Sequence, residues 1–84
     1  MTINEFIKQR KSLMWYAGDY DKLSETAIAE AVLNYGGFND VKKMINILSI
    51  KKTAAIFRKL AKQKRSNLRP EIKHYFNLFF KKYA

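Results

Sequence analysis

The stretch from Val32 to Leu60, VLNYGGFNDVKKMINILSIKKTAAIFRKL, contains a helix end, a complete helix, a very short turn and the start of a basic helix. Gly36 and Gly37 predict the end of the first helix, because glycine adopts left-handed backbone at low cost. Asn39 or Asp40 can then cap the next helix. This stretch therefore predicts consecutive helices joined by tight turns.

The helix after the glycine pair carries apolar residues at i, i+3, i+4 and i+7, namely Val41, Met44, Ile45 and Leu48. Ser49 follows directly and is a good N-cap, so we expect a link of one or two residues and two steeply crossing axes. In the following helix, spacing places four residues inward and leaves a basic outer side. The inward residues are Thr53, Ile56, Phe57 and Leu60, and the outer side holds Lys51, Lys52, Ala55, Arg58, Lys59 and Lys62, with Arg65 at its fringe.

Further helices are predicted on both sides of this stretch. The first covers Asn4 to Tyr16, and Gly18 with Asp19 and Asp21 then favours a turn. Ser24 caps a second helix, whose apolar positions are Ile28, Ala31, Val32 and Tyr35.

The last helix begins at Pro70, which suits the first helical position because its missing N–H costs nothing there. It follows the connector KQKRSN and carries an apolar stripe that we interpret as core, formed by Ile72, Tyr75, Phe76, Phe79, Phe80 and Tyr83. No run alternates convincingly as a strand would. The sequence therefore predicts an all-α fold, a compact bundle of about five short helices with a helix-turn-helix-like corner between the third and fourth.

A chain of 84 residues is expected to form one domain over residues 1–84, because a second core would not fit. It contains no cysteine, so packing must stabilise it without disulfides. Neither a secretory signal nor a run of ~20 apolar residues is present. We therefore expect a cytoplasmic protein that does not enter a membrane.

The net charge of +10 is unevenly distributed along the chain. Residues 1–40 carry four basic and six acidic side chains, a balance of −2, whereas residues 41–84 carry thirteen basic side chains and only Glu71, a balance of +12. Such polarity is typical of a domain with one side facing a polyanion, although a solvated lysine-rich surface would give the same count.

The sequence offers little for catalysis. The one histidine, His74, falls on the polar side of the last helix, and there is no cysteine to pair with it. The carboxylates are scattered, and Asp19 with Asp21 is better explained by turn chemistry. Gly36 and Gly37 lack the pattern of a phosphate loop, and no metal-ligand spacing is present. We expect no enzyme, metal or cofactor.

The basic helix after Ser49 suggests duplex DNA as a partner. In a helix-turn-helix the second helix enters the major groove. Lys51, Lys52, Ala55 and Arg58 would then face the groove, and the phosphates would be contacted by Lys59, Lys62, Lys64 and Arg65. An ordinary helical corner with solvated lysines is the alternative, and the turn is shorter than usual and lacks glycine.

Two other interpretations concern the aromatic residues. Exposed aromatics between basic groups form stacking platforms for single-stranded nucleic acids. An amphipathic last helix with lysines on its polar side could instead lie on a membrane surface. Packing of these aromatic residues in a bundle core explains the same helical spacing. We prefer this interpretation to both the stacking platform and the membrane-surface helix.

Three blocks, SLMWY (12–16), VLNYGGFNDV (32–41) and RSNLRPEIKHYFNLFF (65–80), resemble those of a small prokaryotic helical family. That family is often encoded beside nucleotidyltransferase toxins of the AbiEii abortive-infection type. Val41 stands where a Trp is common in it, and Tyr75-Phe76 replaces Phe-Trp. The resemblance implies an antitoxin or accessory role.

The leading hypothesis is accordingly a non-enzymatic, antitoxin-like regulator of a toxin–antitoxin or phage-defence module, which binds a nucleotidyltransferase toxin and, through the corner, its operator DNA. Trp15, Tyr16 and Tyr20 in the more acidic half are the expected toxin-binding residues, because Trp and Tyr are favoured in interface cores. The alternative is a stand-alone basic nucleic-acid-binding module. Both hypotheses allow a homodimer, since helix-turn-helix modules commonly read two half-sites.

Overall fold

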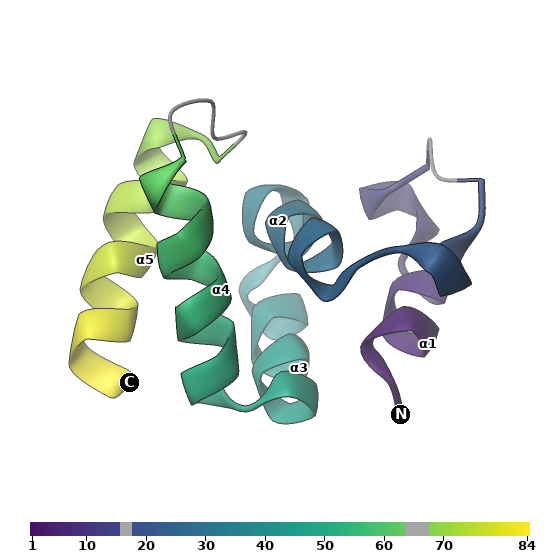
Figure 1. The fold of residues 1–84 in the computed structure, drawn as a ribbon, viewed down its shortest axis with the longest axis horizontal. Coiled ribbons are helices and arrows are strands. Elements are labelled where there is room, and N and C mark those ends of the chain that lie inside the picture. The colour runs from purple at the N-terminus through teal and green to yellow at the C-terminus, as the bar shows by residue number, and fades with distance from the viewer. Residues whose placement is uncertain (16–17, 64–67) are drawn as a thin grey trace.

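The computed structural model describes residues 1–15, 18–63 and 68–84, and in these ranges it contains helices and no strand. The five α-helices (Figure 1) are α1 (Ile3–Lys8), α2 (Glu25–Tyr35), α3 (Phe38–Leu48), α4 (Ile50–Lys62) and α5 (Pro70–Tyr83). Two short 3₁₀ turns, η1 (Lys11–Leu13) and η2 (Tyr20–Lys22), lie between α1 and α2. The predicted all-α bundle of about five short helices is confirmed.

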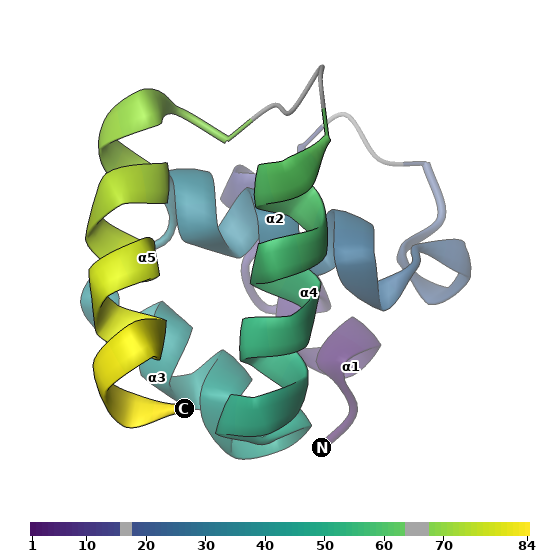
Figure 2. The same cartoon turned by 60° about the vertical axis from the view of Figure 1, so that its left-hand side comes forward.

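Helix α4 lies between α5 and the other helices. Figures 1 and 2 show α4 and α5 side by side and running in opposite directions, and Figure 2 shows α2 crossing behind them. Helix α4 contacts α2, α3 and α5, whereas α1 packs against α2 and α3 at the far side of the bundle (Figure 1). One side of α4 is therefore covered by three neighbours, and its other side faces solvent.

The first helix is much shorter than the predicted span from Asn4 to Tyr16, because α1 ends at Lys8. A longer helix would place Arg10 three residues after Ile7, on the face that packs into the core. Ending α1 early lets the Arg10 guanidinium leave that face and donate from Nε to Asp40 Oδ1 at 2.8 Å. Met14 still reaches the core, and Tyr16 lies outside the described residues.

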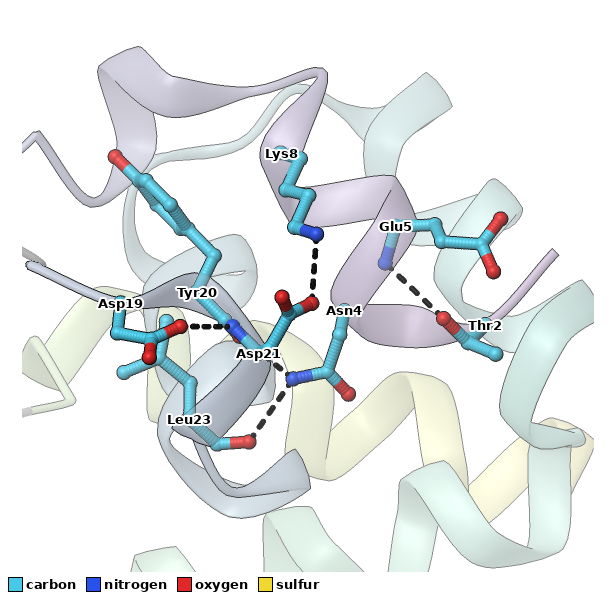
Figure 3. Close-up of polar contacts among 8 residues, drawn as sticks. All are labelled: Thr2, Asn4, Glu5, Lys8, Asp19, Tyr20, Asp21 and Leu23. Atoms are coloured by element: carbon cyan, nitrogen blue, oxygen red, sulfur yellow. Dashed lines mark hydrogen bonds and ion pairs between the residues drawn. The ribbon is translucent and has the colours of Figure 1, made fainter.

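The segment before α2 is fastened to α1 by side-chain contacts (Figure 3). The Asn4 side-chain amide donates to the carbonyls of Tyr20 and Leu23, at 2.7 and 3.1 Å. The Asp19 carboxylate accepts from the backbone N–H of Asp21 at 3.0 Å, which confirms the turn predicted there. The Asp21 carboxylate also pairs with Lys8 at 2.6 Å, so both aspartates have structural partners.

Helix α2 begins as predicted, with the Ser24 hydroxyl accepting from the N–H of Ala27 at 3.1 Å. The predicted apolar positions of α2 are buried except for Tyr35, whose side chain is 61% exposed. Treating Tyr35 as core was therefore wrong. It belongs to the last turn of α2 and lies on the outer side of the helix.

The prediction of left-handed glycines after α2 was also wrong, because Gly36 and Gly37 have φ values of −76° and −75°. Glycine is needed at position 36 for space instead, since a Cβ there would lie 2.7 Å from the Val32 carbonyl oxygen. The N-cap of α3 is Gly37 and neither Asn39 nor Asp40. Asp40 acts from within the first turn, where Oδ2 accepts from the N–H of Gly37 at 3.1 Å.

Ser49 alone links α3 to α4, as the sequence predicted. Its hydroxyl accepts from the N–H of Lys52 at 3.2 Å, and its carbonyl accepts from the Thr53 hydroxyl at 2.7 Å. The link is so short that Ser49 takes a φ of 79°, the one positive φ at a non-glycine residue of the described chain. Serine adopts this backbone at a cost, which its two hydrogen bonds help to offset.

The core between α4 and α5 is aromatic. The buried Phe57 ring of α4 lies 6.3 Å from that of Phe76 and 5.3 Å from that of Phe80, centroid to centroid. The interpretation of the whole α5 stripe as core was too broad, because Tyr75 and Tyr83 are 50% and 56% exposed. They lie at the margins of the stripe, and one neighbouring helix covers only its centre.

The start of α5 is held against the end of α2. Arg69 has the extended backbone predicted before Pro70, and its N–H donates to Asn34 Oδ1 at 3.1 Å. Its guanidinium donates to the Asn34 carbonyl and lies 5.3 Å from the centroid of the Tyr35 ring. Asn34 is buried, so these bonds satisfy a polar side chain inside the core.

The Phe57→Ala substitution is expected to lower the free energy of unfolding by about 3–5 kcal/mol, because it removes a fully buried ring and leaves a cavity. That is a large part of the ~5–15 kcal/mol typical of a domain. Leu78→Ala, on the exposed side of α5, should cost no more than about 0.5 kcal/mol. Chemical denaturation of both variants measures this, and equal losses would contradict the assignment of Phe57 to the core.

The pKa of the Asp40 carboxyl is lowered from its ordinary value of 3.8, chiefly by the hydrogen bond from Arg10 and also by the N–H of Gly37. A lowered folded-state pKa adds stability above the unfolded pKa, and this stability is lost as the pH falls through the folded pKa. Asp40→Asn should therefore cost about 1–2 kcal/mol at pH 7, with the loss shrinking as the pH falls below 3.8 and through the lowered pKa of the folded state.

Urea denaturation across this pH range measures the linkage, and Glu5→Gln, at an exposed carboxylate of α1, is the control. A loss for Asp40→Asn that stayed constant from pH 7 to pH 3 would show that the ion pair is not responsible.

Candidate nucleic-acid interface

Helix α4 has one buried side and one basic side. Its buried residues are Thr53, Ala54, Phe57 and Leu60, of which the sequence analysis missed only Ala54. Ile56, predicted to point inward, is half-buried. The basic face of α4 is defined here by exposed residues at i, i+4, i+7, i+8 and i+11, which are Lys51, Ala55, Arg58, Lys59 and Lys62.

Most acidic side chains of the protein already pair with basic groups elsewhere. Asp19, Asp21 and Asp40 pair with Lys22, Lys8 and Arg10, all in the N-terminal half.

On α4, Lys52 is neutralised by Glu25 at the start of α2, with Nζ 2.8 Å from Oε2. Lys51, Arg58, Lys59 and Lys62 form no ion pair with any residue in the described ranges. Their positive charges are thus available to an external anion.

The dimensions of the basic face suit a nucleic-acid groove. Lys51 and Lys62 are eleven residues apart, which corresponds to about 16 Å along a helix. The major groove of B-DNA is ~12 Å wide and admits one α-helix. Ala55 is the one small side chain within this face, so the backbone of α4 can come close to a surface there.

Of the eight residues predicted to contact nucleic acid, the structure brings five together on the basic face of α4. Lys52 lies beside them but is held by Glu25. Lys64 and Arg65 lie outside the described residues. The link at Ser49 is shorter than the usual helix-turn-helix turn of about 3–4 residues, so α4 would need its own approach to a groove.

The three predicted partner-binding residues do not behave alike. Trp15 is 79% exposed and lines a hollow of about 530 Å³ together with Ser12, Leu13 and Tyr35. Tyr20 is half-buried, and its hydroxyl donates to the Met14 carbonyl at 3.0 Å, which gives it a structural role. Tyr16 lies outside the described residues. Tyr35 was missed because helical spacing placed it in the core.

The described residues offer little support for a catalytic site, a metal site or a membrane span. His74 is exposed on α5, as predicted. Across the described ranges no three His, Asp or Glu side chains gather as metal ligands would. Among the described helices, none has the length and apolar character needed to cross a bilayer.

Comparison with models of known protein families finds no match to this chain, and comparisons with curated proteins and with solved structures find none either. The resemblance to the helical family encoded beside AbiEii-type toxins therefore rests on the three sequence blocks alone.

Proposed function

We propose that this chain is a non-enzymatic, antitoxin-like regulator that acts in the cytoplasm and binds duplex DNA through the basic face of α4. The observation that carries the proposal is the set of four exposed cations, Lys51, Arg58, Lys59 and Lys62, which no described carboxylate neutralises. A cluster of this kind attracts a polyanion and gains affinity by releasing the counterions of the phosphates.

The roles within the basic face follow from position along α4. Lys51, Ala55 and Arg58, nearer the N-terminus, would face the groove, where an arginine can bond a guanine edge with two hydrogen bonds. Lys59 and Lys62 would contact phosphates, with Lys64 and Arg65 extending that set by sequence. Two copies of the chain on two half-sites would increase both affinity and specificity.

The second part of the proposal is a protein partner, a nucleotidyltransferase toxin of a toxin–antitoxin or phage-defence module. Its support is the resemblance of the three sequence blocks to an antitoxin-like family. The exposed Trp15 ring and the hollow beside it, which Tyr35 also lines, add a surface of the composition that interface cores favour.

A stand-alone nucleic-acid-binding module is the second candidate function. This candidate is favoured because the basic face lies entirely on α4 of a single chain. No second protein is needed to complete it. The two candidates share the DNA interface and differ only in the toxin.

Replacing Lys51 and Arg58 together by alanine should weaken binding of the chain to a 20-base-pair duplex by at least fivefold at moderate salt. Replacing Lys59 and Lys62 together, which are placed on phosphates, should make the logarithm of the binding constant fall less steeply with the logarithm of salt concentration, by about 1 per lost phosphate contact. The Lys11→Ala, Lys22→Ala pair removes the same charge from the N-terminal half and should change both quantities much less. Fluorescence anisotropy titrations measure both.

No measurable affinity of the unaltered chain at low salt would remove the DNA interface from both candidates. Equal losses in all three double variants would show that net charge alone, and no particular face, attracts the duplex.

Trp15→Ala should weaken capture of the protein encoded beside this one by tenfold or more, because truncating a central interface tryptophan commonly costs ≥ ~2 kcal/mol. Tyr20→Phe should leave capture unchanged and lower the free energy of unfolding by about 1 kcal/mol, since it loses one hydrogen bond. Pull-down with both purified proteins measures this. If the neighbouring protein is not captured by the unaltered chain, the stand-alone candidate is favoured.

A further inference from the structure

An apolar groove lies between α3 and α5, at the N-terminal end of α4. It has a volume of about 490 Å³, and its principal lining residues are Phe38, Lys42, Ile45, Ile50, Phe79 and Tyr83. Figure 2 shows the ribbons that border it, with α5 and α4 in front and α3 behind. The volume falls in the ~300–1,000 Å³ range of protein binding pockets.

An aromatic row forms one side of this groove. The Phe79 ring lies 6.2 Å from that of Phe38, in an edge-to-face arrangement, and 5.0 Å from that of Tyr83. Phe38 and Tyr83 are nevertheless 48% and 56% exposed. Neighbouring apolar side chains that remain exposed together are typical of an interaction surface.

The groove is long enough for a helix. A smaller hollow of about 220 Å³ shares Phe38 with it and reaches Tyr75 on α5. Tyr83 lies eight positions after Tyr75, so the apolar edge of α5 between them spans about 12 Å, which matches about two turns of a partner helix. The floor contains the aliphatic side chains of Ile45 and Ile50, against which the apolar knobs of a helix can pack.

The margins of the groove are positive. Lys42 Nζ lies 5.1 Å from the centroid of the Phe38 ring, and Lys82 Nζ lies 5.3 Å from that of Tyr83. Neither lysine forms an ion pair within the described ranges. The one acidic residue of the C-terminal half, Glu71, lies 3.9 Å from Arg69 at the other end of α5. Both lysines are thus available to carboxylates of an occupant.

Charge and ring geometry also discriminate between the ligands that could fill the groove. A second copy that used the same face would bring four lysines, Lys42 and Lys82 of each chain, into one interface that holds no carboxylate, which is unfavourable. A nucleic-acid base would need an open ring face for stacking, whereas the Phe38 and Phe79 rings meet edge to face at 85°. A partner helix with an apolar stripe flanked by acidic residues matches both the apolar floor of the groove and its positive margins.

We propose that the groove between α3 and α5 binds an amphipathic helix of a protein partner, with the apolar stripe of that helix on Phe38, Ile45, Phe79 and Tyr83 and its acidic residues beside Lys42 and Lys82. This is the helix-in-groove mode of recognition. The inference goes beyond the proposed function, because it requires neither DNA on α4 nor a toxin at Trp15.

A display library of 16-residue helical peptides, selected on the unaltered chain, tests the inference. The selected peptides should carry apolar residues at i, i+3 or i+4, and i+7, with an excess of Asp and Glu beside that stripe. When their binding to the isotopically labelled chain is followed by NMR, the largest amide shifts should fall in α3 and α5. Selected peptides without an acidic excess, or amide shifts elsewhere, would overturn the proposal.

Matched variants locate the binding. Phe38→Ala combined with Tyr83→Ala should weaken the selected peptides by at least tenfold, whereas Leu78→Ala, an exposed apolar change on α5 outside the groove, should not. Lys42→Glu combined with Lys82→Glu should weaken acidic peptides by at least fivefold. The Arg58→Ala, Lys62→Ala pair should leave peptide binding unchanged while lowering DNA affinity, which separates this inference from the proposed function.

Two further outcomes would contradict the inference in favour of another occupant. One is a dimer of the unaltered chain, seen by analytical ultracentrifugation, that Phe38→Ala with Tyr83→Ala dissociates. The other is displacement of the peptides by a thymidine oligonucleotide whose own binding is lost in that variant. Circular dichroism and thermal melts of each variant show whether it is folded, and the NMR mapping on the unaltered chain needs no variant at all.

Discussion

The packing of Phe57 against Phe76 and Phe80 is the interaction on which both candidate surfaces depend. The Phe57 ring is buried between α4 and α5, and it fixes how α4 is rotated about its axis. Lys51, Arg58 and Lys62 must then project away from the bundle, because the helical period sets their angle to Phe57. The same contact draws the centre of the α5 stripe inward and leaves its margins outside. One buried aromatic cluster thereby produces a basic face on α4 and an exposed aromatic edge on α5.

The N-terminal half contributes in a different way, by polar contacts that consume its charges. Asp40 accepts from Arg10 and from the N–H of Gly37, so one carboxylate joins the end of α1 to the start of α3. Lys8 is held by Asp21, and its pKa is raised chiefly by that hydrogen bond. This half is therefore nearly self-neutralised. The C-terminal half has almost no carboxylates for its lysines, and that is where both proposed surfaces lie.

The sequence was sufficient for the number and order of the helices, and insufficient for the length of α1 and for the margins of the apolar stripes. Periodicity and caps predicted α4 well, because Ser49 and the spacing of Thr53, Phe57 and Leu60 agree with one another. Arg10 could not be placed from local pattern, since its partner Asp40 is thirty residues away. Tyr35 and Tyr83 have helical spacing that fits a core, and only the number of neighbouring helices leaves them exposed. The basic face of α4 was predictable from spacing alone, whereas the groove depends on how α3 and α5 are placed.

The two proposed surfaces meet at the start of α4, and this has a mechanical consequence. Ile50 lies in the floor of the groove, and Lys51, the next residue, begins the basic face. Both follow Ser49, whose positive φ and paired hydrogen bonds set the direction in which α4 leaves α3. A partner helix that contacts Ile50 would therefore lie close to Lys51, the first cation of the basic face. Acidic residues on that helix would also lower the local positive potential. Occupancy of the groove and binding of a polyanion by α4 are thus expected to oppose each other through charge, without any change in the fold.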